Sequence, residues 1–325
     1  MPAIQTNIVV PTLCVHSPLS SVARLNYTYR NKVDNGAFAI WQRGVSFALT
    51  TAAYTADRWY VSLVGNVTRE SFLPGESELM DNSRYYLKTN PSGSLPAFIE
   101  QRVESVWTLA GKQTTLTFWA KAGISGSVMS VTAIQYFGTG GSANVATVVA
   151  SATLTTAWIK HTMVVTVPSI SGKTVGTDGN DYVAIRFSLP IDDVSLCNVQ
   201  WEQGPLATDF ELRPYDEELR LCQRFYEQTD LTPDQFALAG VGISGTQALF
   251  AVPYQEKRII PTITMPAALK IYGIGDTPTW SAQVPDTSST TIGNQIARVP
   301  TGPIDKTVVV GRASEACNIK IDAEI

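Results

Sequence analysis

The sequence predicts an all-β protein built around a jelly-roll β-sandwich, and three observations lead to this prediction. Of its 325 residues, 44% are hydrophobic and only 16% are charged, so the chain can bury a large core. Short runs rich in β-branched and aromatic residues recur at even spacing between Gly, Ser, Pro and Asn. One segment alone shows clear helical spacing. We therefore expect a jelly-roll β-sandwich, one connecting helix and a smaller C-terminal β-sandwich domain.

The first domain carries its strand signals in consecutive segments. The predicted strands fall within residues 112–123, 126–138, 143–154, 158–168 and 181–190. Alternation is clearest in "KHTMVVTVP", where Thr162, Val164 and Thr166 share one face and the residues between them share the other. One face of this strand should meet solvent and the other the core.

The expected helix is "RPYDEELRLCQRFYEQ", residues 213–228. Leu219, Cys222 and Phe225 or Tyr226 recur at a spacing of three to four residues. Three acidic residues, 216–218, stand early, where the positive end of a helix dipole favours them. Further strands are predicted within 247–266, 269–274, 306–313 and 317–325, with long surface loops at 275–305.

This pattern divides the chain into four parts. We expect an N-terminal segment at 1–34, a jelly roll at 35–212, a connecting helix at 213–230 and a C-terminal β domain at 231–325.

Charge and cysteine usage exclude several classes. A net charge of −4 and a pI near 5.3 argue against nucleic-acid binding, which needs clustered Lys and Arg. The cysteines at 14, 197, 222 and 317 form no Cys-x-x-Cys pair, so we expect buried thiols and no zinc site. No secretory signal or apolar run long enough to cross a membrane is visible, so we expect no membrane insertion.

Catalytic patterns are weak. The chain has two histidines, 16 and 161, and its Gly-rich stretches lack the context of a phosphate-binding loop. The turn "TDGNDY" offers oxygen ligands but lacks the closing Glu of a helical calcium loop. We therefore expect no catalytic residues, metal or cofactor, although a carboxylate pair across a cleft leaves no spacing signal.

Aromatic residues have two possible roles, because an indole ring can stack on a sugar or fill a core. Trp119, Trp158 and Trp201 lie in strand-like runs and are expected in the core. The candidate glycan contacts are Trp280, Tyr136, Asp178, Asn180 and Asp181. The expected structural framework comprises Trp41, Arg43, Asp57, Arg58, Trp59, Trp201 and Cys222.

Several motifs occur in an order that resembles tail-fibre and receptor-binding proteins of tailed bacteriophages and prophages. They are "NGAFAIWQRG", "YTADRWYVS", "LTFWAKAG", "VQWEQGPLATDFELRPYDEELRLCQRFYE", "EKRIIPTITM" and "IKIDAEI". The resemblance covers nearly everything from Asn31 to Ile325. It implies a carbohydrate-binding jelly roll, and it implies that the Trp-Arg clusters are architectural: Trp rings in the core, guanidinium groups on buried carbonyls, and Asp57 fixing one guanidinium.

The resemblance leaves three functions open. The first is a non-enzymatic virion fibre or spike, made in the host bacterial cytoplasm and assembled as a homotrimer, that binds host cell-surface polysaccharide and joins other virion proteins through residues 1–34. The second is a structural virion subunit, such as a head fibre or tail adaptor, without glycan affinity. The third is a surface-polysaccharide depolymerase, which needs two carboxylates across a groove.

Overall fold

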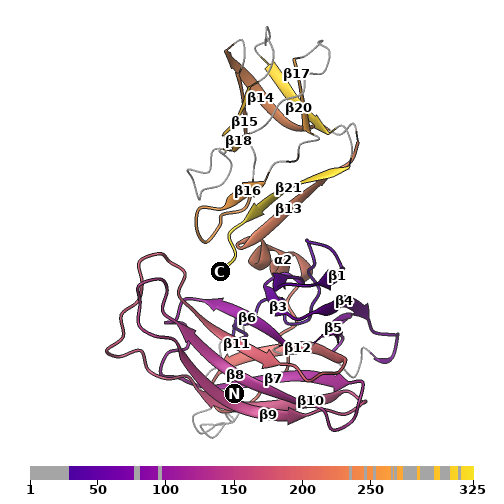
Figure 1. Ribbon diagram of the computed structural model, residues 1–325, viewed down its shortest axis with the longest axis vertical. Helices are drawn as coiled ribbons and strands as arrows, with labels where there is room; N and C mark the ends of the chain where they lie inside the picture. Colours follow the sequence, from indigo (N-terminus) through magenta and orange to yellow (C-terminus); the bar gives the residue numbers. More distant parts are fainter. Residues whose placement is uncertain are drawn as a thin grey trace, which may run out of the picture.

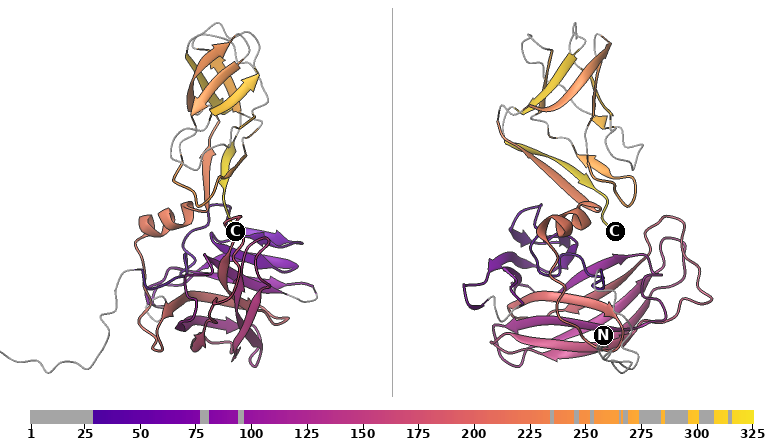
Figure 2. Two further views of the ribbon diagram at one scale, coloured as in Figure 1. Left: turned by 90° about the vertical axis from the view of Figure 1, so that its left-hand side faces the viewer. Right: turned by 180° about the vertical axis from the view of Figure 1, so that it is seen from behind.

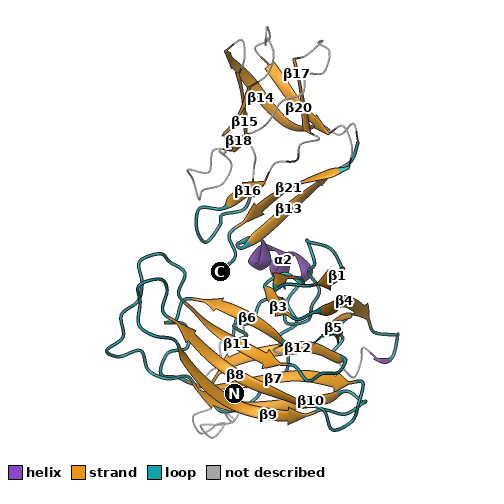
Figure 3. Cartoon of the chain, viewed as in Figure 1, coloured by secondary structure: helices purple, strands orange, loops and turns teal. Residues whose placement is uncertain are grey.

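The computed structural model contains a large β-sandwich, a short helix and a C-terminal β part (Figure 1). Strands dominate the architecture, as the sequence predicts (Figure 3). The structure describes residues 29–76, 81–93, 97–233, 236–244, 247–251, 254–264, 266, 269–273, 284–285, 296–300, 308–313 and 316–325.

The sandwich consists of two six-stranded antiparallel sheets, which we call sheet A and sheet B. Sheet A has the order β1 (Ser46–Leu49), β4 (Gly65–Ser71), β5 (Tyr85–Pro91), β12 (Val194–Gln203), β7 (Gln113–Ala122), β10 (Ile159–Thr166). Sheet B has the order β2 (Ala53–Tyr54), β3 (Trp59–Ser62), β6 (Phe98–Glu104), β11 (Tyr182–Ser188), β8 (Val128–Tyr136), β9 (Val145–Thr153).

The core lies between the two sheets and is aromatic at its centre. Phe118 of sheet A meets Phe187 of sheet B edge to face, with ring centroids 5.1 Å apart. Trp59 lies 6.4 Å from Phe187 and is fully buried. In β10 the predicted alternation is confirmed, because Met163 and the residues at 165 and 167 are buried while those at 162, 164 and 166 are exposed.

The helix is shorter than the sequence predicts. α2 (Tyr215–Gln223) begins after Pro214 with the expected acidic first turn, and Cys222 is fully buried. The helical spacing continues to Tyr226, but Tyr226 begins strand β13 (Tyr226–Leu231) and pairs with Asp322. Strand pairing with a distant segment therefore ends the helix before its hydrophobic pattern does.

The C-terminal part contains two further sheets. The three-stranded sheet β13-β21-β16 uses β21 (Cys317–Asp322) and β16 (Thr262–Thr264). The six-stranded sheet has the order β17 (Leu269–Gly273), β20 (Val308–Ala313), β14 (Phe236–Ser244), β15 (Gln247–Ala251), β19 (Ile296–Pro300), β18 (Val284–Pro285). Strands β18 and β19 fall where the sequence analysis predicts only loops, so that prediction is wrong for these residues.

α2 lies between the sandwich and the three-stranded sheet (Figure 1). Both views of Figure 2 show the C-terminal part extending from the sandwich on the side of α2, while the chain end returns to the sandwich. The distal sheet is therefore reached and left through the same narrow region.

The motif at 35–44 forms a compact turn that hydrogen bonds hold against the core. The Asn35 side-chain amide donates to the backbone carbonyls of Ile40 (2.8 Å) and Asp57 (3.0 Å), and the backbone carbonyl of Asn35 accepts the Trp59 indole N–H (3.0 Å). A Cβ on Gly36 would lie 2.2 Å from the Val199 carbonyl oxygen, so this contact with β12 requires glycine. Asn35 and Gly36 therefore hold this segment against β12 and the loop before β3.

The two arginines of the opening motifs have different partners. Arg43 lies 3.8 Å from Asp57, and its guanidinium centre stands 3.4 Å from the Tyr226 ring centroid. Arg58, buried and at a positive φ of 73°, donates to the Arg102 carbonyl (2.6 Å) and pairs with Glu324 at 2.5 Å. The guanidinium groups thus connect the opening segment to β13 and to the residues after β21.

We expect Trp59→Ala to lower the free energy of unfolding by about 3–5 kcal/mol, because it empties a fully buried site at the centre of the core. Urea denaturation measures the loss. Trp107→Ala is the matched control, because Trp107 is 66% exposed and its removal should leave the midpoint unchanged. A normal midpoint for Trp59→Ala would show that this ring does not support the core.

We expect Glu324→Ala to cost about 3–5 kcal/mol, because it leaves the buried Arg58 guanidinium without its nearest carboxylate. Equilibrium denaturation followed by tryptophan fluorescence tests this. Glu256→Ala removes an exposed carboxylate and should change stability little. Equal midpoints for the two variants would contradict a stabilising role for the Arg58–Glu324 pair.

Candidate functional site

The outer face of sheet A carries a polar row that runs across neighbouring strands. The register aligns Thr68 of β4 with Lys88 of β5, Lys88 with Ser195 of β12, and Ser195 with Lys121 of β7. Paired residues of antiparallel strands share a face, and this face is opposite to the one that buries Phe118. Side chains from four separate segments of the chain therefore form one continuous surface.

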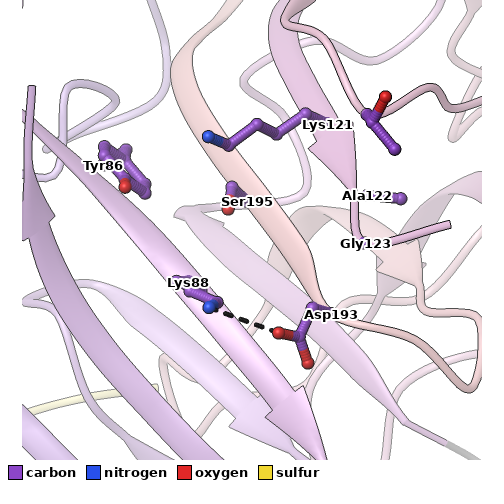
Figure 4. Close-up of a pocket in the computed structure, with 8 residues that line it drawn as sticks. Tyr86, Lys88, Lys121, Ala122, Gly123, Asp193 and Ser195 are labelled. Carbon is purple, nitrogen blue, oxygen red and sulfur yellow. Dashed lines mark ion pairs between the residues drawn. The ribbon is translucent and has the colours of Figure 1, made fainter.

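A depression of about 300 Å³ lies at the end of this row. Its lining residues are Tyr86, Lys88, Lys121, Ala122, Gly123, Thr156, Asp193 and Ser195. Figure 4 shows the Lys121 side chain reaching over Ser195 toward Tyr86, with Lys88 and Asp193 facing each other beyond. The depression offers amino, hydroxyl and carboxylate groups to a polar ligand.

Three aromatic rings form a wall beside the depression. The Tyr86 ring centroid lies 4.8 Å from that of Phe72 and 5.2 Å from that of Trp158, to which it is nearly perpendicular. Phe72 and Trp158 are 5.3 Å apart. Phe72 is buried, whereas Tyr86 and Trp158 are partly exposed, so these two can present ring surface to a ligand.

The two lysines of the site are held differently. Lys88 Nζ lies 3.2 Å from a carboxylate oxygen of Asp193. Lys121 Nζ lies 4.9 Å from the Trp158 ring centroid and 5.5 Å from that of Tyr86, and it makes no ion pair within the described part of the chain. Lys121 is therefore oriented by aromatic rings and keeps its charge available.

Two titratable groups with raised pKa values lie on the same face of sheet A as the polar row. Cys197 of β12, fully buried, is aligned with Trp119 of β7, and burial raises the pKa of its thiol well above the usual range. Burial also raises the pKa of the Tyr86 hydroxyl, with a further contribution from Glu70 and Glu76. At neutral pH both groups are uncharged, so neither adds a negative charge beside Lys121.

The turn that carries Gly123 is fixed by Asp192. This carboxylate accepts hydrogen bonds from the backbone N–H groups of Ile124 and Asp193 and from the Ser127 hydroxyl, each at 2.8 Å. A Cβ on Gly123 would lie 2.7 Å from an Asp192 oxygen, so glycine lets the turn approach this carboxylate. The edge of the depression is consequently rigid.

A second depression, of about 270 Å³, lies beside α2. Its charged lining groups are largely paired with one another: Arg213 lies 3.2 Å from Glu218 and 3.8 Å from Asp34, and Arg224 lies 2.9 Å from Glu104. These pairs join α2 to the sandwich, so we assign this region to structure.

The predicted glycan contacts lie away from the first depression. Tyr136, on β8 of sheet B, stacks on Tyr182 with centroids 4.9 Å apart. Asp181 accepts hydrogen bonds from the Ser105 hydroxyl (3.1 Å) and the Val106 N–H (2.8 Å). Tyr136 and Asp181 therefore lie near each other, at the start of β11 in sheet B.

The other predicted contacts are loop residues or lie outside the described residues. Asp178 accepts from the backbone N–H of Thr139 (3.0 Å) and of Asn180 (3.1 Å). The Thr139 side chain and, after it, these two backbone bonds lower the pKa of Asp178 to about 2. The Asn180 side-chain oxygen accepts from Arg258. Trp280 lies outside the described residues. Glycan contact by this group stays a prediction.

Trp119 and Trp158 do not lie between the sheets, so their assignment to the core is wrong. Both are partly exposed on the outer side of sheet A, whereas Trp201 is fully buried as expected. The signal was present in "LTFWAKAG": if Phe118 faces the core, the two-residue period of a strand places Trp119 and Lys121 on the opposite face. Lys88 and Ser195 had no comparable signal, because strand order brings them together.

Comparisons with known proteins give low similarity. No protein-family model matches the chain, and no curated protein matches its sequence. The CBM22-2 xylan-binding domain of Paenibacillus barcinonensis Xyn10C is 17% identical with a TM-score of 0.35, over 45% of this chain and 92% of that one. A putative sugar binding protein from Bacteroides thetaiotaomicron is 17% identical with a TM-score of 0.35, over 54% of this chain and 100% of that one.

A structure from a bacteriophage also appears among the similar ones. The enzymatically active domain of tailspike protein 4 of bacteriophage CBA120 is 17% identical with a TM-score of 0.31, over 54% of this chain and 22% of that one. Similarity at this level assigns no function to this chain.

The residues that the structure describes form neither a metal site nor a membrane-spanning helix. No group of three or more His, Cys, Asp or Glu side chains is arranged to hold a metal ion. Within the same residues, no helix combines the length and apolarity needed to cross a membrane.

We expect the Cys197 thiol to resist iodoacetamide at pH 8 in the native protein, because it is buried and its raised pKa leaves little thiolate. Leu196 of β12 is aligned with Leu87 of β5, so Tyr86 is next to Cys197 on the outer face, and the thiol acts on its hydroxyl. Tyr86→Ala should therefore uncover the thiol and accelerate labelling, as peptide mass spectrometry would show. Tyr136→Ala, on sheet B, is the control and should not. Equal labelling of Cys197 in both variants would contradict the packing of Tyr86 over this thiol.

Proposed function

We propose that this protein is a non-enzymatic virion fibre or spike protein that attaches to a host by binding cell-surface polysaccharide on the outer face of sheet A. The observation that carries the proposal is the depression of about 300 Å³, which combines a polar row with an aromatic wall. Sugar rings present C–H faces that pack on aromatic rings and hydroxyls that need directed hydrogen bonds. Tyr86 and Trp158 serve the first requirement, and Lys88, Ser195 and Asp193 serve the second.

The charges of the depression favour binding over hydrolysis. Asp193 is the one carboxylate among its lining residues, and it is ion-paired with Lys88. The common mechanisms of glycoside hydrolysis use two carboxyl groups on either side of the scissile bond. An unpaired second carboxylate would be needed before depolymerase activity could be assigned here.

The virion location rests on the order of motifs between Asn31 and Ile325, which resembles phage fibre proteins. In this proposal three copies assemble, residues 1–34 join the chain to other virion proteins, and the protein is made in the host bacterial cytoplasm before assembly. A trimer gives several weak sugar sites a combined avidity much greater than that of one site.

The test is binding of fluorescently labelled protein to intact bacteria, with and without competing purified surface polysaccharide. We expect saturable binding that the polysaccharide displaces, and an affinity about tenfold lower in Tyr86→Ala and in Trp158→Ala, because each removes one stacking surface. Trp107→Ala is the control, since it deletes an exposed indole elsewhere in the chain. Circular dichroism checks that each variant is folded.

The same samples separate the alternatives. No binding by the folded protein would favour a structural virion subunit, and new reducing ends in the polysaccharide would indicate a depolymerase. Loss of binding in Trp280→Ala, with Tyr86→Ala unaffected, would move the site from sheet A to the C-terminal part.

A further inference from the structure

We propose that the depression on sheet A recognises an acidic sugar, with the Lys121 ammonium pairing with the carboxylate of a uronic-acid residue. This inference rests on the glycan binding proposed above and specifies the chemical class of the ligand. It depends on the free charge of Lys121, on the Ser195 hydroxyl, and on the fact that no nearby carboxylate pairs with Lys121.

Lys121 is the available cation of the site. Its ammonium lies beside the adjoining Trp158 and Tyr86 rings, 4.9 and 5.5 Å from their centroids, and no carboxylate in the described part of the chain approaches it within ion-pair distance. Aromatic rings orient a cation without neutralising it, so a ligand carboxylate meets a charge that is already positioned. Figure 4 shows this ammonium over the depression, between Tyr86 and Ser195.

The lining residues carry one excess positive charge. Lys88 and Asp193 cancel each other across 3.2 Å, which leaves Lys121. The side chains of that pair are 40% and 34% exposed, so the pair is weak and Lys88 can turn toward a ligand anion at little cost. The local charge is therefore opposite in sign to the net charge of −4 on the whole chain.

Ser195 supplies an unused hydroxyl. The residue is only 4% exposed, lines the depression between Lys88 and Lys121, and makes no side-chain hydrogen bond within the described residues. A hydroxyl that lines the depression and makes no hydrogen bond to the protein is free to donate one to a ligand. A carboxylate between the two lysines would accept that hydrogen bond.

Three carboxylates around the depression have their own donors, whereas one buried oxygen of Asp81, which like Lys121 acts on the Cys197 thiol, has none among the described residues. Glu70 accepts from the Thr68 hydroxyl at 2.8 Å, and Glu76 accepts from the Leu73 N–H at 3.1 Å. Asp192 accepts the three hydrogen bonds that fix the Gly123 turn. These groups lower the local positive potential, but none of them is paired with Lys121, so its charge remains available to the ligand.

The experiment measures the affinity of the full chain for defined polysaccharides by biolayer interferometry. Polygalacturonate and alginate carry carboxylates, dextran and xylan are neutral, and dextran sulfate carries a different anion. We expect the native protein to prefer the carboxylated pair. Lys121→Gln should weaken binding to that pair by about tenfold to hundredfold, the range for a lost charged hydrogen bond, and leave neutral binding unchanged.

Two variants control for charge and folding. Lys160→Gln removes an exposed lysine aligned with Trp119 on the same face, outside the depression, and should change affinity less than about twofold. Lys121→Arg keeps the charge and should retain most of the affinity. If Lys121→Gln and Lys160→Gln lost affinity equally, general surface charge would explain the binding, and the assignment to Lys121 would be overturned.

The remaining outcomes separate this inference from the function on which it rests. Binding to neutral polysaccharide alone, unaffected by Lys121→Gln, would overturn the acidic-sugar inference and leave glycan binding standing. Equal Lys121-dependent binding of dextran sulfate would overturn the choice of carboxylate. Failure of the folded protein to bind any of the five polysaccharides would count against both proposals.

Discussion

The buried guanidinium of Arg58 is the interaction on which the assembly of the chain depends. A buried charge is tolerated only when partners surround it, and here they come from distant segments. Asp34 lies 3.4 Å away, Glu324 lies 2.5 Å away, and the Phe225 ring centroid is 3.2 Å from the guanidinium carbon. The opening segment, the region after α2 and the residues after β21 can satisfy this charge only when all have reached their places. Arg58 therefore makes the joining of these parts cooperative.

The outer face of sheet A depends on a simpler constraint, the registration of strands. Lys88, Ser195 and Lys121 form a row because β5, β12 and β7 are neighbours in the sheet, and Cys197 and Trp119 form the next aligned pair on the same face. Their spacing follows from backbone hydrogen bonds and needs no additional support. A surface of this kind can change its side chains without changing its geometry, because outward-facing positions do not contribute to the core between the sheets.

The sequence predicted the features that neighbouring residues determine, such as strands and the start of the helix. Alternation identified the strands and placed Met163 in the core, and the acidic first turn marked the start of α2. The sequence could not reveal where α2 ends, because pairing of Tyr226 with Asp322 decides it. For the same reason the site was not predicted, since strand order brings Lys88 and Lys121 together and no local pattern records strand order.

The pairing of β13 with β21 gives the C-terminal part an unusual independence. Every strand of the distal sheet lies between these two in the sequence, yet the two strands run side by side where they leave the sandwich. The distal sheet is formed by two excursions of the chain, one between β13 and β16 and one between β16 and β21, because β16 returns to pair with β21. Replacing the distal strands while keeping 254–264 would leave the Arg58 contacts and the Arg258 hydrogen bonds to Gly179 and Asn180 in place. The base could therefore carry a different distal module, provided that this module returns the chain to the position of β16.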